Sequence, residues 1–143
     1  MRADPRTATE VRATLDRFAG AYERRDMDAV MGMVACDPDV VVLGSGSDER
    51  RVGPVQVREQ IERDWQQSDA ASFEYGWMQI SASGSVAWVA CDLTFLATIE
   101  GETDHFPGRL TVVLEKRDGD WLIVLWHFAI PPAEQAVGES FPN

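Results

Sequence analysis

Four apolar segments joined by three short turns fill the second half of the chain, and they constrain its fold more than any other feature. The segments cover about residues 73–83, 86–99, 109–117 and 121–130. The intervening sequences SGS, EGE and DG are typical of tight turns between antiparallel strands. Consecutive hairpins of this kind predict an antiparallel meander and exclude a repeated βαβ arrangement.

The first half of the chain has helical periodicity instead. Between about residues 7 and 25 an apolar residue recurs every three or four positions, which predicts one helix with a buried stripe of Val11, Leu15, Phe18 and Tyr22. A second, shorter helix is expected after Asp26 and should end near Cys36, because a residue that precedes proline disfavours helix. A short hairpin around GSGSDE follows, and then a third helix that opens at Gly53-Pro54 and ends between Gln66 and Ala71.

Length and charge limit the organisation and the partners. The 143 residues suffice for a single domain, 1–143, in which only the tail from about 134 to 143 is expected to be loose. The formal net charge of −11 disfavours nucleic acid and anionic membranes as partners. Neither a secretory signal nor an apolar run long enough for a membrane span is present, so a cytoplasmic location is the default expectation.

The sequence predicts no metal site and no cofactor. Cys36 and Cys91 are far apart in apolar surroundings and are expected to be buried, reduced thiols. His105 and His127 are isolated rings without a metal-ligand spacing.

Four stretches of the sequence carry a resemblance that covers nearly the whole chain: RRDMDAVMGMV, DPDVVVLGSGSDERRVG, GSVAWV and GRLTVVLEKRDGDWLIVLWHFAIP. The chain resembles the SnoaL-like, ketosteroid-isomerase-related branch of the nuclear transport factor 2-like superfamily. The resemblance implies an α+β, cystatin-like cone, in which three N-terminal helices pack in a strongly curved, mixed, mostly antiparallel sheet around a central hydrophobic pocket. It also implies that the protein binds a small organic ligand, with anions among the candidate ligands, and that it forms a homodimer through the sheet.

The last strand, within WLIVLWHFAIPP, contains one titratable ring, His127. Simple alternation places His127 on one face with Leu125, and Trp126 with Phe128 on the other. By resemblance the His127 face points into the cone, which leaves Trp126 and Phe128 as a candidate dimer surface. A one-residue bulge in the last hairpin would bring Arg109 across from His127.

These residues form the candidate catalytic set. His127 would act as the acid or base, Arg109 would stabilise an anion, and Asp92 would orient the pair. The alternative is structural: His127 would be a ring paired with a backbone or carboxylate group, and Arg109 would form an ion pair with Asp92 or Glu115. The candidate ligand-binding residues are Tyr22, Phe18, Trp65, Trp88, Thr111 and Leu125. Asp64, on the third helix, is expected at the surface, and the alternative is that it reaches the mouth of the pocket.

Comparison with ketosteroid isomerases argues against their usual chemistry. The positions that would hold their oxyanion tyrosine, catalytic base and second oxyanion acid are occupied here by Phe18, Gly44 and about Thr111. Two functions remain open. One is a cofactor-free isomerase, lyase, cyclase or hydrolase that works by proton transfer, and the other is a non-catalytic ligand-binding or dimerisation module.

Overall fold

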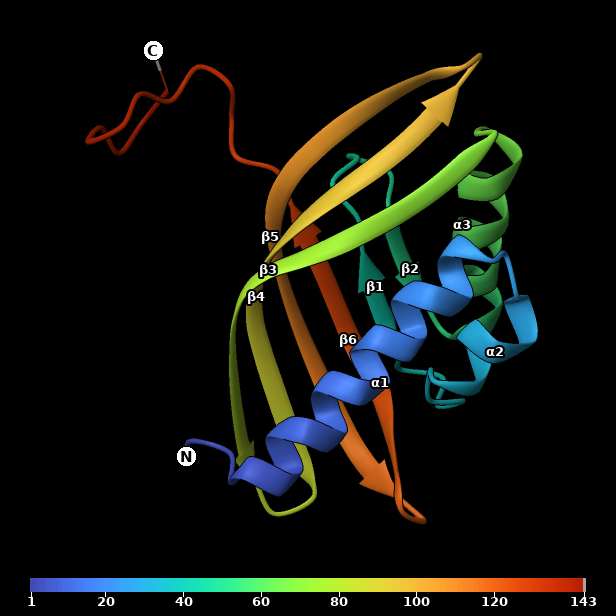
Figure 1. Ribbon diagram of the computed structural model, residues 1–143, viewed down its shortest axis with the longest axis vertical. Helices are drawn as coiled ribbons and strands as arrows, with labels where there is room; N and C mark the ends of the chain where they lie inside the picture. Colours follow the sequence, from blue (N-terminus) through green and yellow to red (C-terminus); the bar gives the residue numbers. More distant parts are fainter. Residues whose placement is uncertain (143) are drawn as a thin grey trace.

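The computed structural model describes residues 1–142, and Figure 1 shows three helices lying in the hollow of one strongly curved sheet. The elements are α1 (Pro5–Glu23), α2 (Met27–Gly32), β1 (Val41–Leu43), β2 (Arg50–Val52), α3 (Pro54–Gln66), β3 (Ala70–Ser83), β4 (Val86–Ile99), β5 (Glu102–Arg117) and β6 (Asp120–Ala129). The sheet order is β2-β1-β6-β5-β4-β3. β1 runs parallel to β6 and every other neighbouring pair is antiparallel, which confirms the predicted mixed cone.

Two boundaries differ from the prediction for physical reasons. β5 begins at Glu102, not near residue 109, because the turn at Glu100 and Gly101 pairs Ile99 directly with Glu102. α2 ends at Gly32, short of Cys36, because the following residues join the sheet. The amide of Ile123 donates to the Met33 carbonyl at 2.8 Å, and the Ala35 amide donates to the Ile123 carbonyl at 2.9 Å.

A β-bulge in β6 overturns the predicted faces of that strand. Leu114 pairs with Ile123 and Val113 pairs with Leu125, so Val124 is an extra residue without an opposite partner. Beyond this bulge the alternation is reversed. Trp126 and Phe128 turn to the concave face, and His127 turns to the outer face.

A second bulge, in β3, coincides with the strong curvature of the sheet. The register slips between Tyr75 and Met78, so Gly76 and Trp77 together lie opposite Asp92. Bulges bend the strand that contains them and increase its twist. β3, β4 and β5 accordingly wrap around α1 in Figure 1.

The core lies between α1 and the concave face of the sheet. Val11, Leu15 and the inward residues between Ala87 and Leu93 of β4 and between Leu110 and Leu114 of β5 are buried there. Asp4 caps the first turn of α1 by accepting a hydrogen bond from the Thr7 amide at 2.8 Å. At the other end Arg25 donates to the carbonyl oxygens of Trp65 and Ser68, at 2.6 and 2.9 Å, and so fixes α1 against the end of α3.

The structure also describes the cysteines, the helix lengths and the C-terminal tail, for which the sequence makes predictions. Both cysteines are free thiols, but only Cys91 is buried as expected; Cys36 is exposed, which corrects its prediction. Within residues 1–142 no helix is long and apolar enough to cross a membrane. No cluster of acidic, histidine or cysteine side chains in the same range could hold a metal ion. Residues 131–142 contain no helix or strand and leave the cone at its wide end (Figure 1).

We expect Gly108→Ala to destabilise the fold by about 1–3 kcal/mol, the usual cost of overpacking. A Cβ atom at Gly108 would contact the Ala129 carbonyl oxygen and would lie 2.7 Å from the Phe128 ring. Urea denaturation measures the effect. Gly32→Ala is the matched control, because a Cβ there meets nothing within 4 Å. Equal stability of the two variants would contradict the close approach of β5 to β6.

Candidate functional site: an apolar cavity with an acidic wall

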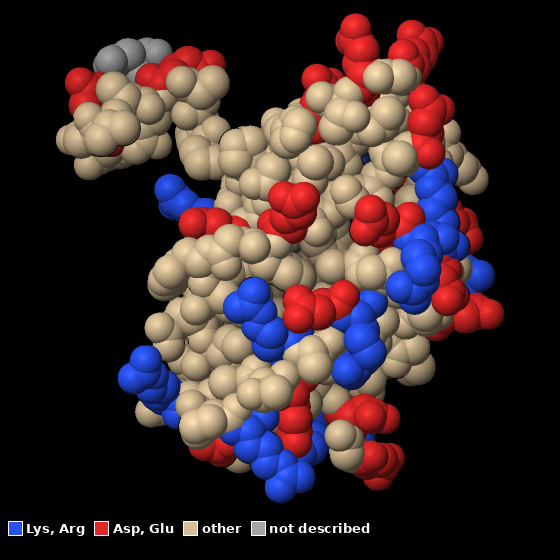
Figure 2. All heavy atoms as spheres, in the orientation of Figure 1, with Lys and Arg blue, Asp and Glu red and all other residues tan. Residues whose placement is uncertain are grey.

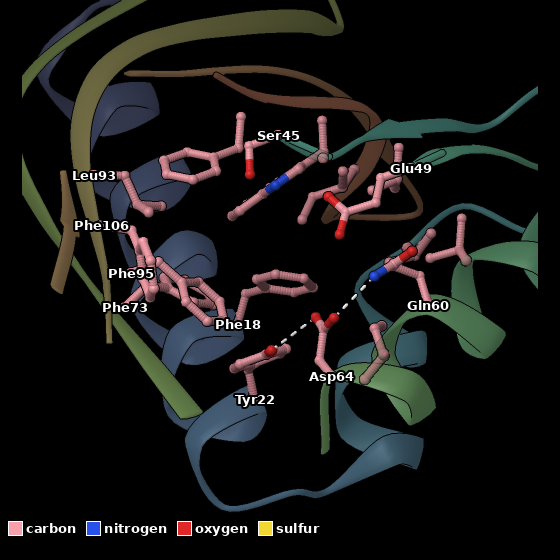
Figure 3. A pocket seen from close by; sticks show the side chains of 18 of the residues that line it. Phe18, Tyr22, Ser45, Glu49, Gln60, Asp64, Phe73, Leu93, Phe95 and Phe106 are labelled. Carbon is pink, nitrogen blue, oxygen red and sulfur yellow. Dashed lines mark hydrogen bonds between the residues drawn. The ribbon is translucent and has the colours of Figure 1, made fainter. Parts of the chain in front are cut away.

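A cavity of about 340 Å³ occupies the wide end of the cone. Residues of α1, α3, the β1–β2 hairpin and strands β3 to β6 line it, and Figure 3 shows it from close by. Ser45, Phe106 and Ile130 line the cavity and are also exposed, so they mark its mouth. Its volume suits a small organic molecule.

One wall of the cavity is aromatic. The rings of Phe18 and Trp126 lie 5.1 Å apart between centroids, and those of Tyr22 and Phe73 lie 5.2 Å apart. Phe95 stacks on Phe73 at 6.4 Å, and Phe106 lies nearer the mouth. Figure 3 shows the labelled phenylalanines on one side and the acidic groups on the other. The inward turn of Trp126 and Phe128 removes them from the candidate dimer surface.

The opposite wall holds a connected set of polar side chains centred on Asp64. The Tyr22 hydroxyl donates to Asp64 Oδ2 at 2.9 Å, and the Gln60 amide nitrogen donates to Asp64 Oδ1 at 2.8 Å. Arg51 donates to Gln60 Oε1 at 2.9 Å. Arg51 can only donate hydrogen bonds, so the Gln60 side chain must turn its amide oxygen toward Arg51. The amide N–H group of Gln60 then points to Asp64.

Burial dominates the electrostatics of this set. It raises the pKa of the Asp64 carboxyl above its ordinary value, against the hydrogen bonds from Gln60 and Tyr22, which lower it. Burial, reinforced by the charge of Asp64, also raises the pKa of Tyr22, which therefore stays protonated. Since Gln60 occupies Oδ1 as a donor, a proton bound to Asp64 lies on Oδ2, which faces the Tyr22 hydroxyl.

Tyr22 can therefore exchange roles with Asp64. When Asp64 is ionised, Tyr22 donates to it and offers only lone pairs to the cavity. When Asp64 is protonated, Oδ2–H can donate to the Tyr22 oxygen, and the Tyr22 O–H is free to turn toward a bound molecule. The pair can thus deliver a proton into an apolar space.

A second acid, Glu49, lies on the same wall. Its Oε1 accepts from Arg63 at 3.1 Å, and its Oε2 accepts from the Gly46 amide at 2.8 Å. Its carboxylate fills the space that a side chain at Gly44 would need, because a Cβ built at Gly44 would collide with Glu49 Oε2. The absence of a side chain at residue 44 is thus what lets Glu49 fold over the cavity wall.

The candidate catalytic residues from the sequence lie elsewhere. His127, Arg109 and Asp92 are exposed on the outer face of the sheet and do not line the cavity. Asp92 pairs in register with Arg109, but Arg109 faces Ala129, and His127 faces Thr111. The bulge at Val124 displaces the register in the direction opposite to the expected one. The prediction that these side chains point into the cone is wrong, and their catalytic role stays a prediction.

The candidate ligand-binding residues divide in the same way. Phe18 and Tyr22 line the cavity. Trp65 packs behind Tyr22, with ring centroids 5.7 Å apart, and so supports the site without lining it. Trp88, Thr111 and Leu125 lie on the outer face.

Sequence reasoning missed Glu49 and Gln60 and placed Asp64 at the surface. A signal for two of them was present: Val57, Gln60, Ile61 and Asp64 follow the spacing of one buried helical face. Polar residues on such a face are candidates for a site. Nothing in the sequence shows that Glu49 folds back over Gly44.

We expect Asp64→Asn to raise the melting temperature at about pH 7.5 and to lose this advantage near pH 4. The folded state holds the Asp64 proton above the ordinary pKa of 3.8, where the unfolded chain has released it. The stability due to the neutral carboxyl is therefore complete below that value and lost as the pH rises through the folded pKa. Asparagine keeps the hydrogen-bonding pattern of the neutral acid.

Thermal denaturation of both proteins across this pH range measures the difference. Asp39→Asn, at an exposed loop position, is the control for the change in net charge. A difference between wild type and Asp64→Asn that does not vary with pH would contradict a raised pKa for Asp64.

Comparisons with known proteins agree with this architecture. The model of the SnoaL-like domain family matches residues 11–133. A comparison with functionally curated proteins found no match.

Solved structures provide similar folds. A Xanthomonas campestris protein named as a putative calcium/calmodulin-dependent protein kinase II association domain is 28% identical, with a TM-score of 0.77 and 87% of each chain covered. A putative dehydratase of the nuclear transport factor 2-like family from Streptomyces avermitilis is 18% identical, with a TM-score of 0.80 and coverage of 90% of this chain and 100% of that one. A putative aromatic ring hydroxylase from Novosphingobium aromaticivorans is 14% identical, with a TM-score of 0.80 and coverage of 90% and 92%.

Proposed function

This chain belongs to the SnoaL-like domain family, and on that premise we propose that it is a cofactor-independent enzyme that acts on a small, largely apolar molecule by acid catalysis. The observation that carries the proposal is Asp64, an acid with a raised pKa at the wall of an aromatic cavity. A buried carboxyl whose pKa is raised keeps its proton to a higher pH and is suited to general acid catalysis.

The reaction class that fits is loss of water from an alcohol. Tyr22 donates its proton to the hydroxyl group of the ligand, and Asp64 Oδ2 replaces that proton on Tyr22. The C–O bond breaks, water leaves with the bonding electron pair, and positive charge develops on the carbon. Glu49 then removes a proton from the adjacent carbon, and that C–H electron pair forms the double bond. Solvent returns the proton from Glu49 to Asp64.

The aromatic wall and the acidic wall of the cavity have different roles in this reaction. Aromatic ring faces stabilise positive charge, and the carboxylate of Glu49 lies on the opposite wall. An anionic intermediate would instead be repelled by the carboxylate of Glu49. This favours acid-initiated chemistry over the enolate chemistry of ketosteroid isomerases, and a dehydratase is the activity named for one protein of similar fold.

Isotope exchange tests the proposal before the natural substrate is identified. Naphthyl methyl carbinol, a secondary benzylic alcohol, is incubated with the protein in water labelled with a heavy oxygen isotope. Reversible cleavage of the C–O bond incorporates the label into the alcohol, and mass spectrometry detects it. We expect Asp64→Asn to lower the exchange rate by at least about 100-fold, the usual contribution of a general acid.

Two further variants make the result specific. Asp39→Asn makes the same Asp-to-Asn change at an exposed loop and should leave the rate of isotope exchange unchanged. His127→Ala tests the prediction made from sequence. Exchange that survives Asp64→Asn but is lost in His127→Ala would refute the role of Asp64 and would favour the outer-face residues.

A second candidate function is assembly through the outer face of the sheet. Trp88, Val113, Leu125 and Val41 are register neighbours on four adjacent strands and form an apolar row there. A protein that is 28% identical is named as an association domain. We propose that this row, in place of Trp126 and Phe128, contacts a second copy of the chain in a homodimer. The cytoplasmic location stays a prediction.

We expect Val113→Asp to convert a dimer into monomers, because a charge in the middle of the row would be buried without a partner. Light scattering after size-exclusion chromatography measures the mass. Thr111→Asp, at an already polar position of the same strand, is the control. A wild-type protein that is monomeric at all concentrations would exclude this assembly.

A further inference from the structure

We propose that the cavity selects ligands that carry one positive charge on an apolar body, with a protonated amine as the simplest example. The inference rests on the proposed function, since it takes the cone cavity to be the ligand site, and it adds the class of ligand. Three independent features of the cavity and its surroundings point to this charge preference.

The first feature is the set of charged groups in the lining. Asp64 and Glu49 line the cavity, and no Lys, Arg or His does so among the residues that the structure describes. Arg63 pairs with Glu49 at 3.1 Å but also with Asp48 at 2.7 Å. Arg63 is therefore shared between two carboxylates and neutralises Glu49 only in part. An anionic ligand would enter without a partner for its charge.

Glu49 is the group best placed to meet a cation. Each of its oxygens accepts one hydrogen bond, from Arg63 or from the Gly46 amide, and an ionised carboxylate has further acceptor sites. Asp64, by contrast, is more deeply enclosed between Tyr22 and Gln60. Glu49 therefore supplies the charge, and Asp64 supplies the proton.

The second feature is the aromatic wall. Phe18, Tyr22, Phe73, Phe95 and Trp126 form a continuous group of rings in the cavity lining. Figure 3 shows Phe18, Phe73 and Phe95 across the cavity from Glu49. The faces of aromatic rings attract cations, and the attraction is stronger where water is excluded. A cation between these rings and one carboxylate would be stabilised from both sides.

The third feature is the approach to the mouth. Alternation along β5 places Glu102 and Asp104 on the same face of the strand as Phe106, which marks the mouth. Figure 2 shows acidic side chains gathered at this end, over the tip of the β4–β5 hairpin. With a net charge of −11, the protein as a whole attracts cations and repels anions.

Three ligands of nearly equal size test the proposal: naphthylethylamine, naphthylethanol and naphthylacetate. Isothermal titration calorimetry with the wild-type protein measures their dissociation constants. We expect the amine to bind at least about tenfold more tightly than the alcohol, from its contacts with rings and carboxylate, and the acid to bind more weakly than either. Equal binding of the amine and the alcohol, or tighter binding of the acid, would overturn the proposal.

Variants identify the side chain that causes the preference for a cationic ligand. Glu49→Gln should lower the ratio of alcohol to amine dissociation constants severalfold, to the part of the preference that the aromatic rings supply, while the alcohol still binds. Glu59→Gln, on the exposed side of α3, makes the same change in net charge and should leave the ratio unaltered. An unchanged ratio in Glu49→Gln would overturn the role of Glu49. Should that variant not fold, the wild-type comparison of the three ligands still decides the charge preference.

The same measurements separate this inference from the function on which it rests. Binding of the alcohol without a preference for the amine would refute the charge preference and leave cavity binding intact. Failure of all three ligands to bind would refute both.

Discussion

The bulge at Val124 governs how this cone is filled. Up to Ile123 the alternation of β6 places Trp121 and Ile123 against α1, and after the extra residue Trp126 and Phe128 take the inward positions. The end of β6 therefore contributes two large rings to the cavity wall, whereas regular alternation would contribute Leu125 and His127. β1 pairs in parallel with β6, and Val42 of β1 is the register partner of Trp126. Val42 therefore faces the cavity as well.

The second constraint is the cost of placing an acid among those rings. Asp64 is enclosed by Tyr22 and Gln60, and Gln60 is in turn oriented by Arg51. These hydrogen bonds satisfy both oxygens of Asp64 without supplying a positive charge at the carboxyl itself. The carboxyl is thus held in place by neutral donors, which is a condition under which burial raises its pKa. Arg25 stabilises the arrangement from outside by joining the ends of α1 and α3, the helices that carry Tyr22 and Asp64.

Taken together, the aromatic wall, the buried acid Asp64 and Glu49 describe a cavity suited to positive charge. The same features that would bind a cation would stabilise a carbon that becomes positively charged when water leaves. Ligand preference and reaction class therefore share one electrostatic origin. On the outer face of the sheet, the apolar row lies between rows of polar side chains. This surface is separate from the cavity, so association through it would not block ligand binding.

The sequence by itself determined the α+β class and the order of its elements, and its resemblance to the SnoaL-like branch implied the cone. Helical periodicity, turn sequences and long apolar strands are local properties. They predicted that α3 opens at Gly53-Pro54 and ends between Gln66 and Ala71, and they predicted β4 at 86–99 with the bounds that the structure has. Phe18 and Tyr22 belong to the stripe of one long helix and line the cavity, and their binding of a ligand stays a prediction. The tertiary structure alone decided which polar residues reach the cavity. One extra residue in β6 inverts a strand face, and no local pattern marks its position. The folding of Glu49 over Gly44, and the contact of Tyr22 with Asp64 across 42 residues, likewise depend on how distant segments pack.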